Sequence, residues 1–567
     1  LVYDTLALTS NLSLNFTNHT IGGDITIVNT NTGRWQLCAP AVDSTAILNI
    51  MGDVIHLNGN FAATGTGNGN TTIIVNHFGD IIASAGNFSI SRGSQGGTGT
   101  TNWYMHNGNI ALSNVTTQNS NPSGARFVFT GNTQDLNLTS VTYSGGGFPV
   151  RVDSAATVNL GTSVIQGSGA FTVSDFGGIY TAQDSGFVKN LLNTGTTTLS
   201  SLGNYGYNGT TAQITGSLLP ATVNTFIVDN SSGVTLSSNL SASTLNLAAG
   251  KLNTGSSNLL TVTGTSTTSI VGGSAMDYVN GPLSLTLPSS LAAGSIYNFP
   301  IGKGSYKPLA LVDAVTNASG SVVVSSEVFD ENAGGTPGTG LTSLNTNRYW
   351  SAQIISGLTE FVSTKVRLTE DVLTSTMGIG NSSTLTGAYD LVSSSAPSGG
   401  TIVSDDMTSL SFFVIGEAGS TSTFALSVSV NNGWNMVSTP GLHPADQNVN
   451  TWWPGKDPAA GVFRFSGGYL PVTTTVPGEG YWMKHLGANT YNYPAIQIVA
   501  HDAITGAAGW NLIGGYETNV ATSGITTSPA GLQTGSVFQY SSGYTVAPNL
   551  VPGYGYWIKL TGAGSIN

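Results

Sequence analysis

Three aspartates in the first part of the chain recur at a spacing that could build a cation site. Asp24, Asp53 and Asp80 each follow a glycine, and they stand 29 and 27 residues apart. If each interval is one turn of a repeating fold, the three carboxylates lie above one another on adjacent turns. Carboxylates at that separation repel, so a cation or a proton would be needed between them. These aspartates are the candidate metal ligands of the sequence.

The same aspartates also suit a structural role. Each directly follows a corner glycine, where an aspartate side chain can cap a turn. The motif continues 29 residues after Gly79 as Gly108-Asn109, and asparagine caps a turn as well as aspartate does. We therefore expect turn capping first, with ion binding and catalysis as the alternatives.

Histidines at the same corners give a second possible metal site. His77 and His106 each stand two residues before a corner glycine, which predicts that their rings stack on adjacent turns. His56 is out of this register. Zinc needs three or four converging protein ligands, and no third partner is evident, so a packed pair is the expected outcome.

The sequence predicts no catalytic residues and no cofactor. Solenoid enzymes that cleave polysaccharides use paired carboxylates, or carboxylates on calcium together with a basic residue. The first glutamate of this chain is Glu327 and the first lysine is Lys189. No Gly-rich phosphate loop, HExxH or GxSxG motif stands in a usable context. A polysaccharide lyase or hydrolase is therefore the least favoured alternative.

Aromatic pairs near the C-terminus are the candidates for contact with a partner or a glycan. Trp452-Trp453 has no counterpart in the second copy of a repeat, which favours a loop specific to the first copy and partner contact there. Tyr481-Trp482 and Tyr556-Trp557 occur at equivalent places in both copies. Their recurrence favours a shared role in the core.

The elements that must position the corner aspartates are short strands. Residues 47–51 and 54–57 read as two strands broken by Gly52-Asp53, and the outline returns over 73–88. Short strands that return at a period in the twenties are typical of a solenoid, in which stacked turns bury the face that one turn cannot. We predict an all-β chain with an N-terminal β-solenoid (β-helix) over residues 1–285.

Two further kinds of β structure are predicted after the solenoid. Residues 286–420 read as an Ig-like β-sandwich, because short apolar strands alternate with Gly- and Pro-rich turns. The clearest repeat follows: Gly433-Trp434-Asn435 returns as Gly509-Trp510-Asn511, 76 residues later. This repeat predicts two small homologous β modules, over 421–493 and 494–567.

Composition excludes some partners. Charged residues make up 7% of the chain and the formal net charge is −12, whereas nucleic acid and anionic lipid select basic surfaces. No apolar run reaches the length of a membrane span. The sequence starts without Met and without a signal peptide, so we expect a mature form cut from a longer precursor.

Two stretches resemble a known class of proteins. The run 219–264, which contains LPATVNTFIVDNSSGVTL, and the run 297–309, YNFPIGKGSYKPL, resemble large secreted surface proteins of the Bacteroidota/Chlorobi type. The GWN…GYW repeats are similar to modules near the C-termini of secreted surface proteins. The resemblance implies solenoid turns, the start of a β-sandwich, and an extracellular location at the cell surface.

These observations predict a non-enzymatic extracellular structural protein. Nearly uncharged polar faces and open solenoid ends are routes to self-assembly into a fibre, sheath or layer. The expected partner is therefore another copy of the chain. The alternative is a surface adhesin or glycan-binding protein that uses the aromatic pair Trp452-Trp453.

Overall fold

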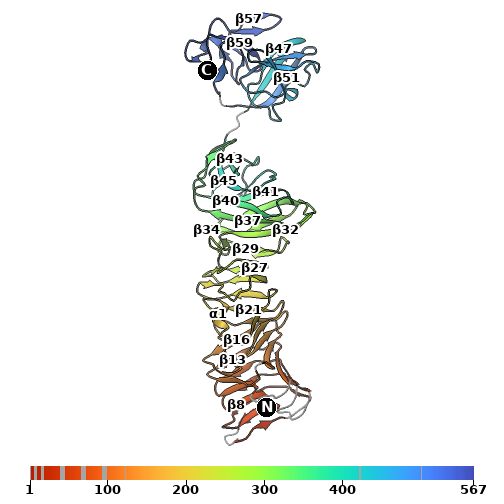
Figure 1. Ribbon diagram of the computed structural model, residues 1–567, viewed down its shortest axis with the longest axis vertical. Coiled ribbons are helices and arrows are strands. Elements are labelled where there is room, and N and C mark those ends of the chain that lie inside the picture. The colour runs from red at the N-terminus through yellow and green to blue at the C-terminus, as the bar shows by residue number, and fades with distance from the viewer. Residues whose placement is uncertain are drawn as a thin grey trace. The chain divides into compact units, whose positions relative to one another are not determined.

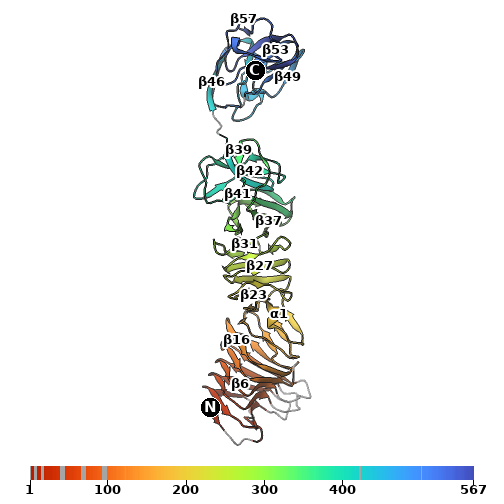
Figure 2. The ribbon, with the colours of Figure 1, turned by 90° about the vertical axis from the view of Figure 1, so that its left-hand side faces the viewer.

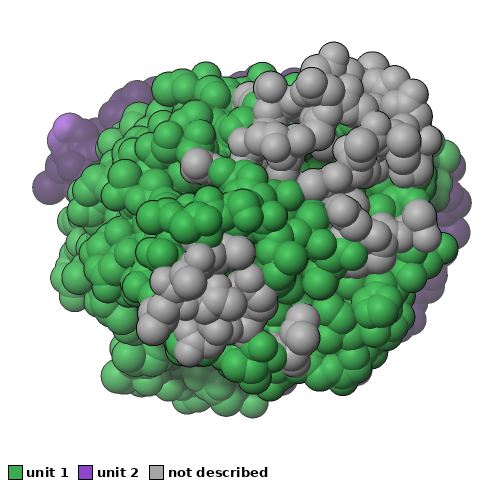
Figure 3. Space-filling model, turned by 90° about the horizontal axis from the view of Figure 1, so that it is seen from below, with its two compact units in different colours: residues 1–418 green, residues 419–567 purple. Residues whose placement is uncertain are grey.

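The computed structural model describes residues 2–4, 9–14, 18–38, 45–64, 72–91, 99–121, 123–419, 423–499 and 501–567. The fold is all-β, with 52% strand and 2% helix, as the sequence predicts. The chain forms two compact units, Leu1–Ala418 and Gly419–Asn567. Both are drawn as ribbons in Figures 1 and 2 and are coloured separately in Figure 3.

The first unit begins with a β-solenoid of about 10 turns, whose turns follow one another from red to yellow-green in Figure 1. The predicted solenoid is confirmed. Three ladders of parallel strands run along its early turns. The first ladder contains β1 (Val2–Asp4), β4 (Ile25–Asn29), β7 (Val54–His56), β10 (Ile81–Ala83), β13 (Ile110–Ser113) and β16 (Gln134–Thr139).

The other two ladders complete each early turn. The second contains β2 (Leu12–Ser13), β5 (Arg34–Cys38), β8 (Asn60–Thr64), β11 (Asn87–Ser91), β14 (Thr116–Asn119) and β17 (Thr142–Gly145). The third contains β3 (Asn18–Ile21), β6 (Thr45–Ile50), β9 (Thr72–His77), β12 (Thr100–Met105), β15 (Ala125–Phe129), β18 (Val150–Val152), β20 (Phe171–Val173) and β22 (Thr197–Leu199).

Later turns extend the first ladder and add a short fourth one beside the helical turn α1 (Phe187–Asn190). The extension contains β19 (Thr157–Asn159), β21 (Gly178–Thr181), β23 (Asn204–Tyr207), β25 (Thr222–Asp229), β27 (Leu240–Ala249), β29 (Leu260–Val262), β30 (Ile270–Gly272) and β32 (Leu283–Leu287). The fourth ladder contains β24 (Gln213–Ile214), β26 (Val234–Thr235), β28 (Leu252–Asn253) and β31 (Val279–Asn280).

The core of the solenoid is built from columns of side chains in register. In β6, β9 and β12 every second residue is buried, because successive side chains of a strand point to opposite faces. Leu48, Val75, Trp103 and Phe127 are consecutive partners along the third ladder and are all buried. One turn alone would leave this column in water, so each turn depends on its neighbours.

The C-terminal end of the solenoid is not an open edge. Strand β32 pairs in parallel with β29 on one side and antiparallel with β37 (Val322–Phe329) on the other. The predicted open end is therefore wrong at this position, because the backbone groups of β32 already have partners in the same unit.

Antiparallel sheets complete the first unit, in the region where the sequence predicts a sandwich. One sheet contains β33 (Ile296–Phe299), β36 (Leu309–Thr316), β41 (Phe361–Thr369) and β44 (Thr401–Val403), and a hairpin contains β34 (Gly302–Lys303) and β35 (Ser305–Tyr306). The strands that continue from β32 and β37 are β38 (Thr336–Pro337), β39 (Leu341–Leu344), β40 (Tyr349–Ser356), β42 (Met377–Ser382), β43 (Ala388–Leu391) and β45 (Phe412–Ala418).

The second unit contains two four-stranded antiparallel sheets of the same strand order, one in each copy of the sequence repeat. The first copy has β47 (Gly433–Ser438), β50 (Gly480–His485), β48 (Val462–Phe465) and β49 (Tyr469–Val472). The second copy has β53 (Gly509–Gly514), β59 (Gly555–Leu560), β56 (Phe538–Tyr540) and β57 (Tyr544–Val546).

Smaller elements surround these two sheets. They are β46 (Thr423–Val430), α2 (Val449–Trp452), β51 (Asn489–Gln497), β52 (Ile504–Gly506), β54 (Val520–Ala521), the 3-10 turn η1 (Thr522–Gly524), β55 (Thr527–Ser528), β58 (Asn549–Leu550) and β60 (Gly564–Ile566). Within the described ranges, no helix has the length and apolar character that crossing a membrane requires.

Candidate ligand-binding surface

The corner aspartates form a continuous hydrogen-bonded ladder. One side-chain oxygen (Oδ1) of Asp24 accepts the backbone N–H of Asp53 at 2.9 Å, and that of Asp53 accepts the N–H of Asp80 at 2.8 Å. Asp80 in turn accepts the N–H of Asn109 at 2.7 Å, and Asn109 accepts that of Asp135 at 2.8 Å. Each side chain therefore accepts a hydrogen bond from the corner of the following turn, whereas the sequence predicts a cap of the aspartate's own turn.

Close stacking at these corners explains the glycine before each aspartate. A Cβ atom added to Gly79 would lie 2.4 Å from the backbone of Gly52, and one added to Gly108 would lie 1.6 Å from the carbonyl oxygen of Gly79. At Gly23, the first corner, a Cβ atom would meet nothing within 4 Å. The glycines therefore let the backbones of successive turns approach.

The described residues do not form a metal site around this ladder of aspartates. No group of three or more His, Cys, Asp or Glu side chains that could hold a metal ion occurs among them. Each of Asp24, Asp53 and Asp80 already has a backbone donor. The geometry thus accounts for these carboxylates without an ion.

The predicted stack of His77 on His106 is wrong. Strand pairing places Met105 next to His77, and the ring of His106 stacks on Phe78 with the centroids 4.7 Å apart. The two strands are offset by 28 residues, whereas Gly79 and Gly108 are offset by 29. The extra residue before the second corner moves His106 out of register.

His56 and His77 are instead core residues. Both are fully buried, and the ring of His56 lies between Phe61 and Phe88, with centroid distances of 6.3 and 6.0 Å. Burial disfavours the charged imidazolium and lowers the pKa of both histidines to about 4. Both side chains are therefore neutral at pH 7.

The structure places Trp452 and Trp453 in the interior, contrary to their predicted contact with a partner. Each is 1% exposed. The short helix α2 carries them into the core of the first repeat, where the indole N–H of Trp452 donates to Gln447 and Trp453 lies 6.2 Å from the ring of Tyr481. The sequence predicts a loop specific to the first copy, whereas the structure has the helical turn α2 there, with both tryptophans in the core.

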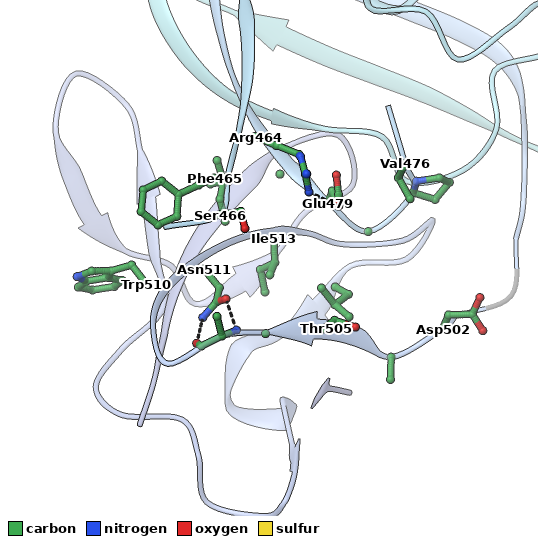
Figure 4. Close-up of a pocket in the computed structure, with 18 of the residues that line it drawn as sticks. Arg464, Phe465, Ser466, Val476, Glu479, Asp502, Thr505, Trp510, Asn511 and Ile513 are labelled. Atoms are coloured by element: carbon green, nitrogen blue, oxygen red, sulfur yellow. Dashed lines mark hydrogen bonds and ion pairs between the residues drawn. The ribbon is translucent and has the colours of Figure 1, made fainter. Parts of the chain in front are cut away.

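The exposed tryptophans of the second unit come from the GWN motif. Gly433 and Gly509 have φ values of 95° and 96°, which glycine adopts readily. The Asn511 side chain accepts the N–H and donates to the carbonyl of Ala507, both at 2.8 Å (Figure 4). Asn435 makes the same pair of bonds to Asn431.

These pairs of asparagine hydrogen bonds hold the central tryptophan of each motif at the surface. Trp434 is 42% exposed and Trp510 is 43% exposed. Trp482 and Trp557 pack beneath them, each with a centroid distance of 6.3 Å, and both are 8% exposed. All four residues of the Tyr-Trp pairs are buried, in agreement with their predicted core role. The sequence did not indicate the exposure of Trp434 and Trp510, because they recur just as the buried pairs do.

Ten aromatic side chains form what we call the aromatic surface of the second unit. They occupy equivalent positions in the two repeats, and each ring pairs with at least one other ring of the set. They are Trp434, Phe463, Phe465, Tyr469, Trp482, Trp510, Phe538, Tyr540, Tyr544 and Trp557.

The two repeats pair with each other reciprocally beneath this surface. The backbone N–H of Ser438 donates to the carbonyl of Gly553 at 2.9 Å, and the equivalent N–H of Gly514 donates to Gly478 at 2.8 Å. The rings repeat this exchange: Phe465 lies on Trp557, and the equivalent Tyr540 lies on Trp482, both at 4.9 Å. The repeats are thus related by an approximate two-fold axis.

Two cavities open beside the aromatic surface. The first, of about 450 Å³, is lined entirely by aromatic side chains: Phe465, Tyr469, Trp510, Phe538, Tyr544 and Trp557. The second, of about 980 Å³, lies between the repeats and is more polar. Figure 4 shows Arg464 beside Glu479 in its wall, with 3.9 Å between the charged groups. Phe465 and Trp510 line both cavities.

The aromatic surface is nearly free of charge. Residues 419–567 contain four Lys or Arg and five Asp or Glu side chains. Lys484 is paired with Asp457 at 3.0 Å, and the Lys559 ammonium lies 5.7 Å from the ring centroid of Trp510. Burial raises the pKa of Tyr469, so its hydroxyl stays protonated. The arrangement can bind a ligand by ring stacking and hydrogen bonding.

Comparison with known proteins gives no relative. No protein-family model matches the chain, and neither a curated protein nor a solved structure is significantly similar to it. The site must therefore be judged from its own geometry.

Proposed function

We propose that the chain is a non-enzymatic extracellular surface protein whose second unit binds a partner through the aromatic surface. The observation that carries this proposal is the matched exposure of Trp434 and Trp510, at 42% and 43%. Rigid aromatic rings lose little conformational entropy on binding and supply much of the binding energy at interfaces. In this proposal the β-solenoid is a stable carrier for the binding unit.

Several features of the chain support the wider proposal. The low content of charge and the resemblance of 219–264 to secreted repeats favour an extracellular location. We also propose that 286–420 is an Ig-like β-sandwich and that 421–493 and 494–567 are homologous modules. Matching strand order and reciprocal contacts support the homology of the two modules.

The test is binding of the full chain to an array that carries polysaccharides, extracellular matrix proteins and lipid vesicles. The Trp434→Ala/Trp510→Ala double variant should lose the binding that the wild-type chain shows. The matched control is Phe78→Ala, which removes an aromatic side chain of similar exposure, 38%, from the solenoid. Equal binding by the wild type and the double variant would remove the aromatic surface as the binding site.

Self-assembly into a fibre, sheath or layer is the second candidate, and one observation favours it. Uncharged polar side chains form ladders along the outer face of the solenoid: Asn76 donates to Asn49 at 2.9 Å, and Asn49 donates to Thr20 at 3.2 Å. Such a face can meet a copy of itself with little charge to desolvate. Electron microscopy at rising concentration should show ordered assemblies; isolated particles at every concentration would exclude this candidate.

A further inference from the structure

The aromatic surface consists of two equivalent half-sites. The first half-site is the set that lines the 450 Å³ cavity. Its repeat-related counterpart, the second half-site, consists of Trp434, Phe463, Tyr469, Trp482, Tyr540 and Tyr544. Tyr469 and Tyr544 are equivalent residues of the two repeats, and both line the first half-site. Both therefore also belong to the second half-site. The half-sites therefore adjoin each other at the approximate two-fold axis of the unit.

Ring geometry in the two half-sites is the same. Trp434 lies 6.1 Å from Phe463, and the equivalent Trp510 lies 5.9 Å from Phe538. The remaining matched ring pairs differ by at most 0.1 Å in centroid distance. Tyr469 and Tyr544 are 55% and 57% exposed. Because the second half-site repeats the ring-centroid distances of the first, we expect both to take the same chemical group.

The lining of the half-sites selects an uncharged ligand. Every side chain in the lining is aromatic. Of the nearby cations, Lys484 is paired with Asp457 and Arg464 with Glu479, which leaves the Lys559 ammonium, 5.7 Å from the ring centroid of Trp510, as the one positive charge beside the first half-site that has no carboxylate partner among the described residues. An anionic polymer or an anionic membrane would need free cations along its path. The second unit instead carries four basic and five acidic side chains.

The size and polarity of the first half-site fit sugar rings. The first cavity, of about 450 Å³, falls in the range of roughly 300–1,000 Å³ that holds small ligands. A pyranose ring can lay its C–H face on an indole or phenol ring while its hydroxyl groups remain in water or meet the tyrosine hydroxyls. Tyr469 and Tyr544 present such hydroxyls between the two half-sites.

We propose that the ligand of the aromatic surface is a neutral, linear polysaccharide that occupies both half-sites at once. This inference rests on the proposed function and deepens it by naming the ligand class. Occupying two adjacent half-sites turns the second contact into an intramolecular one, so a long chain binds more tightly than a short one. A disaccharide, by contrast, fills each half-site separately.

The test is calorimetric titration of the full chain with neutral polysaccharides (a glucan, a mannan and a xylan), anionic alginate, and disaccharides of the neutral polymers. We expect two disaccharides per wild-type chain, one for Trp434→Ala, one for Trp510→Ala, and none for the double variant. For the polysaccharide, each single variant should lower affinity about tenfold or more. Alginate should not bind, and Phe78→Ala should match the wild type.

Other outcomes separate this inference from the proposed function. A single disaccharide per wild-type chain, or unchanged polysaccharide affinity in both single variants, would overturn the two half-sites. Binding to matrix proteins or vesicles alone, lost in the double variant, would overturn the carbohydrate ligand while the binding function stands. If neither tryptophan affects binding to any class, the proposed function fails as well.

Discussion

At the corners of the solenoid, the backbones of successive turns lie so close that single positions require glycine. Gly108→Ala should destabilise the solenoid by about 3 kcal/mol, because the new methyl group would overlap the carbonyl oxygen of Gly79. Gly23→Ala is the matched control, since its methyl group would enter open space. Urea unfolding followed by circular dichroism measures both. Equal stability of the two variants would contradict the close approach of these corners.

The capping ladder makes a second prediction at the residue scale. Asp53→Ala removes the acceptor for the backbone N–H of Asp80 and should cost about 1 kcal/mol. Asp53→Asn keeps an oxygen acceptor and should cost less. Because capping needs no ion, calcium and a chelator should leave the unfolding midpoint of the wild type unchanged. A calcium-dependent rise in that midpoint, absent in Asp53→Ala, would restore the ion-site alternative.

Buried neutral histidines make the solenoid sensitive to acid. The pKa of His56 is about 4 in the folded chain and about 6.5 when unfolded. Below pH 6.5 the unfolded chain therefore takes up the proton first, and stability falls until the pH reaches about 4; above pH 6.5 this effect is absent.

Replacing His56 measures its share of the acid sensitivity. Between pH 7.5 and pH 4.5, the free energy of unfolding of His56→Leu should fall by about 2 kcal/mol less than that of the wild type. The comparison cancels the contribution of carboxylates, which titrate in both proteins. Equal losses in the two proteins would show that the His56 ring takes up a proton without unfolding.

At the scale of elements, the helical turn α2 places the aromatic pair Trp452-Trp453 in the core. Trp453→Ala should lower the stability of the second unit by about 3–5 kcal/mol, because it removes a fully buried indole. Trp434→Ala, which truncates a side chain at the surface, should cost much less. Calorimetry of the full chain resolves the difference. A small effect of Trp453→Ala would contradict its burial.

Regular repetition is the part of the structure that the sequence predicts well. Corner pairs such as Gly52-Asp53 recur at a nearly constant interval, so the solenoid turns and their strands follow from sequence alone. The same reasoning fails for His106, because a single extra residue shifts the strand register without changing the corner motif. The local sequence motif thus predicts where a corner lies, whereas the pairing of strands determines which side chains of adjacent turns are neighbours.

Burial of individual aromatic residues depends on contacts that the sequence does not display. Trp452-Trp453 looks like a surface loop because it lacks a counterpart, yet α2 packs it into the core. Trp434 and Trp510 look like core residues because they recur, yet the turn of the GWN motif holds them outside. Reciprocal pairing of the two repeats creates the aromatic surface, and it brings together residues of different repeats that are far apart in the sequence, such as Phe465 and Trp557.

At the scale of the whole molecule, the two compact units differ in structure. The first unit gains its stability from stacked turns that pass directly into antiparallel sheets through β32 and β37. The second unit concentrates the exposed aromatic rings in a nearly neutral surface. Because the two units are compact in themselves, we expect a change in one unit to leave the other intact.

The most direct measurement is the dissociation constant of the full chain for the partner that the array identifies, compared between the wild type and Trp434→Ala/Trp510→Ala. Loss of two aromatic contacts should weaken binding by about 100-fold or more, with both units still folded by calorimetry. Dissociation constants within about twofold of each other would contradict binding through the aromatic surface.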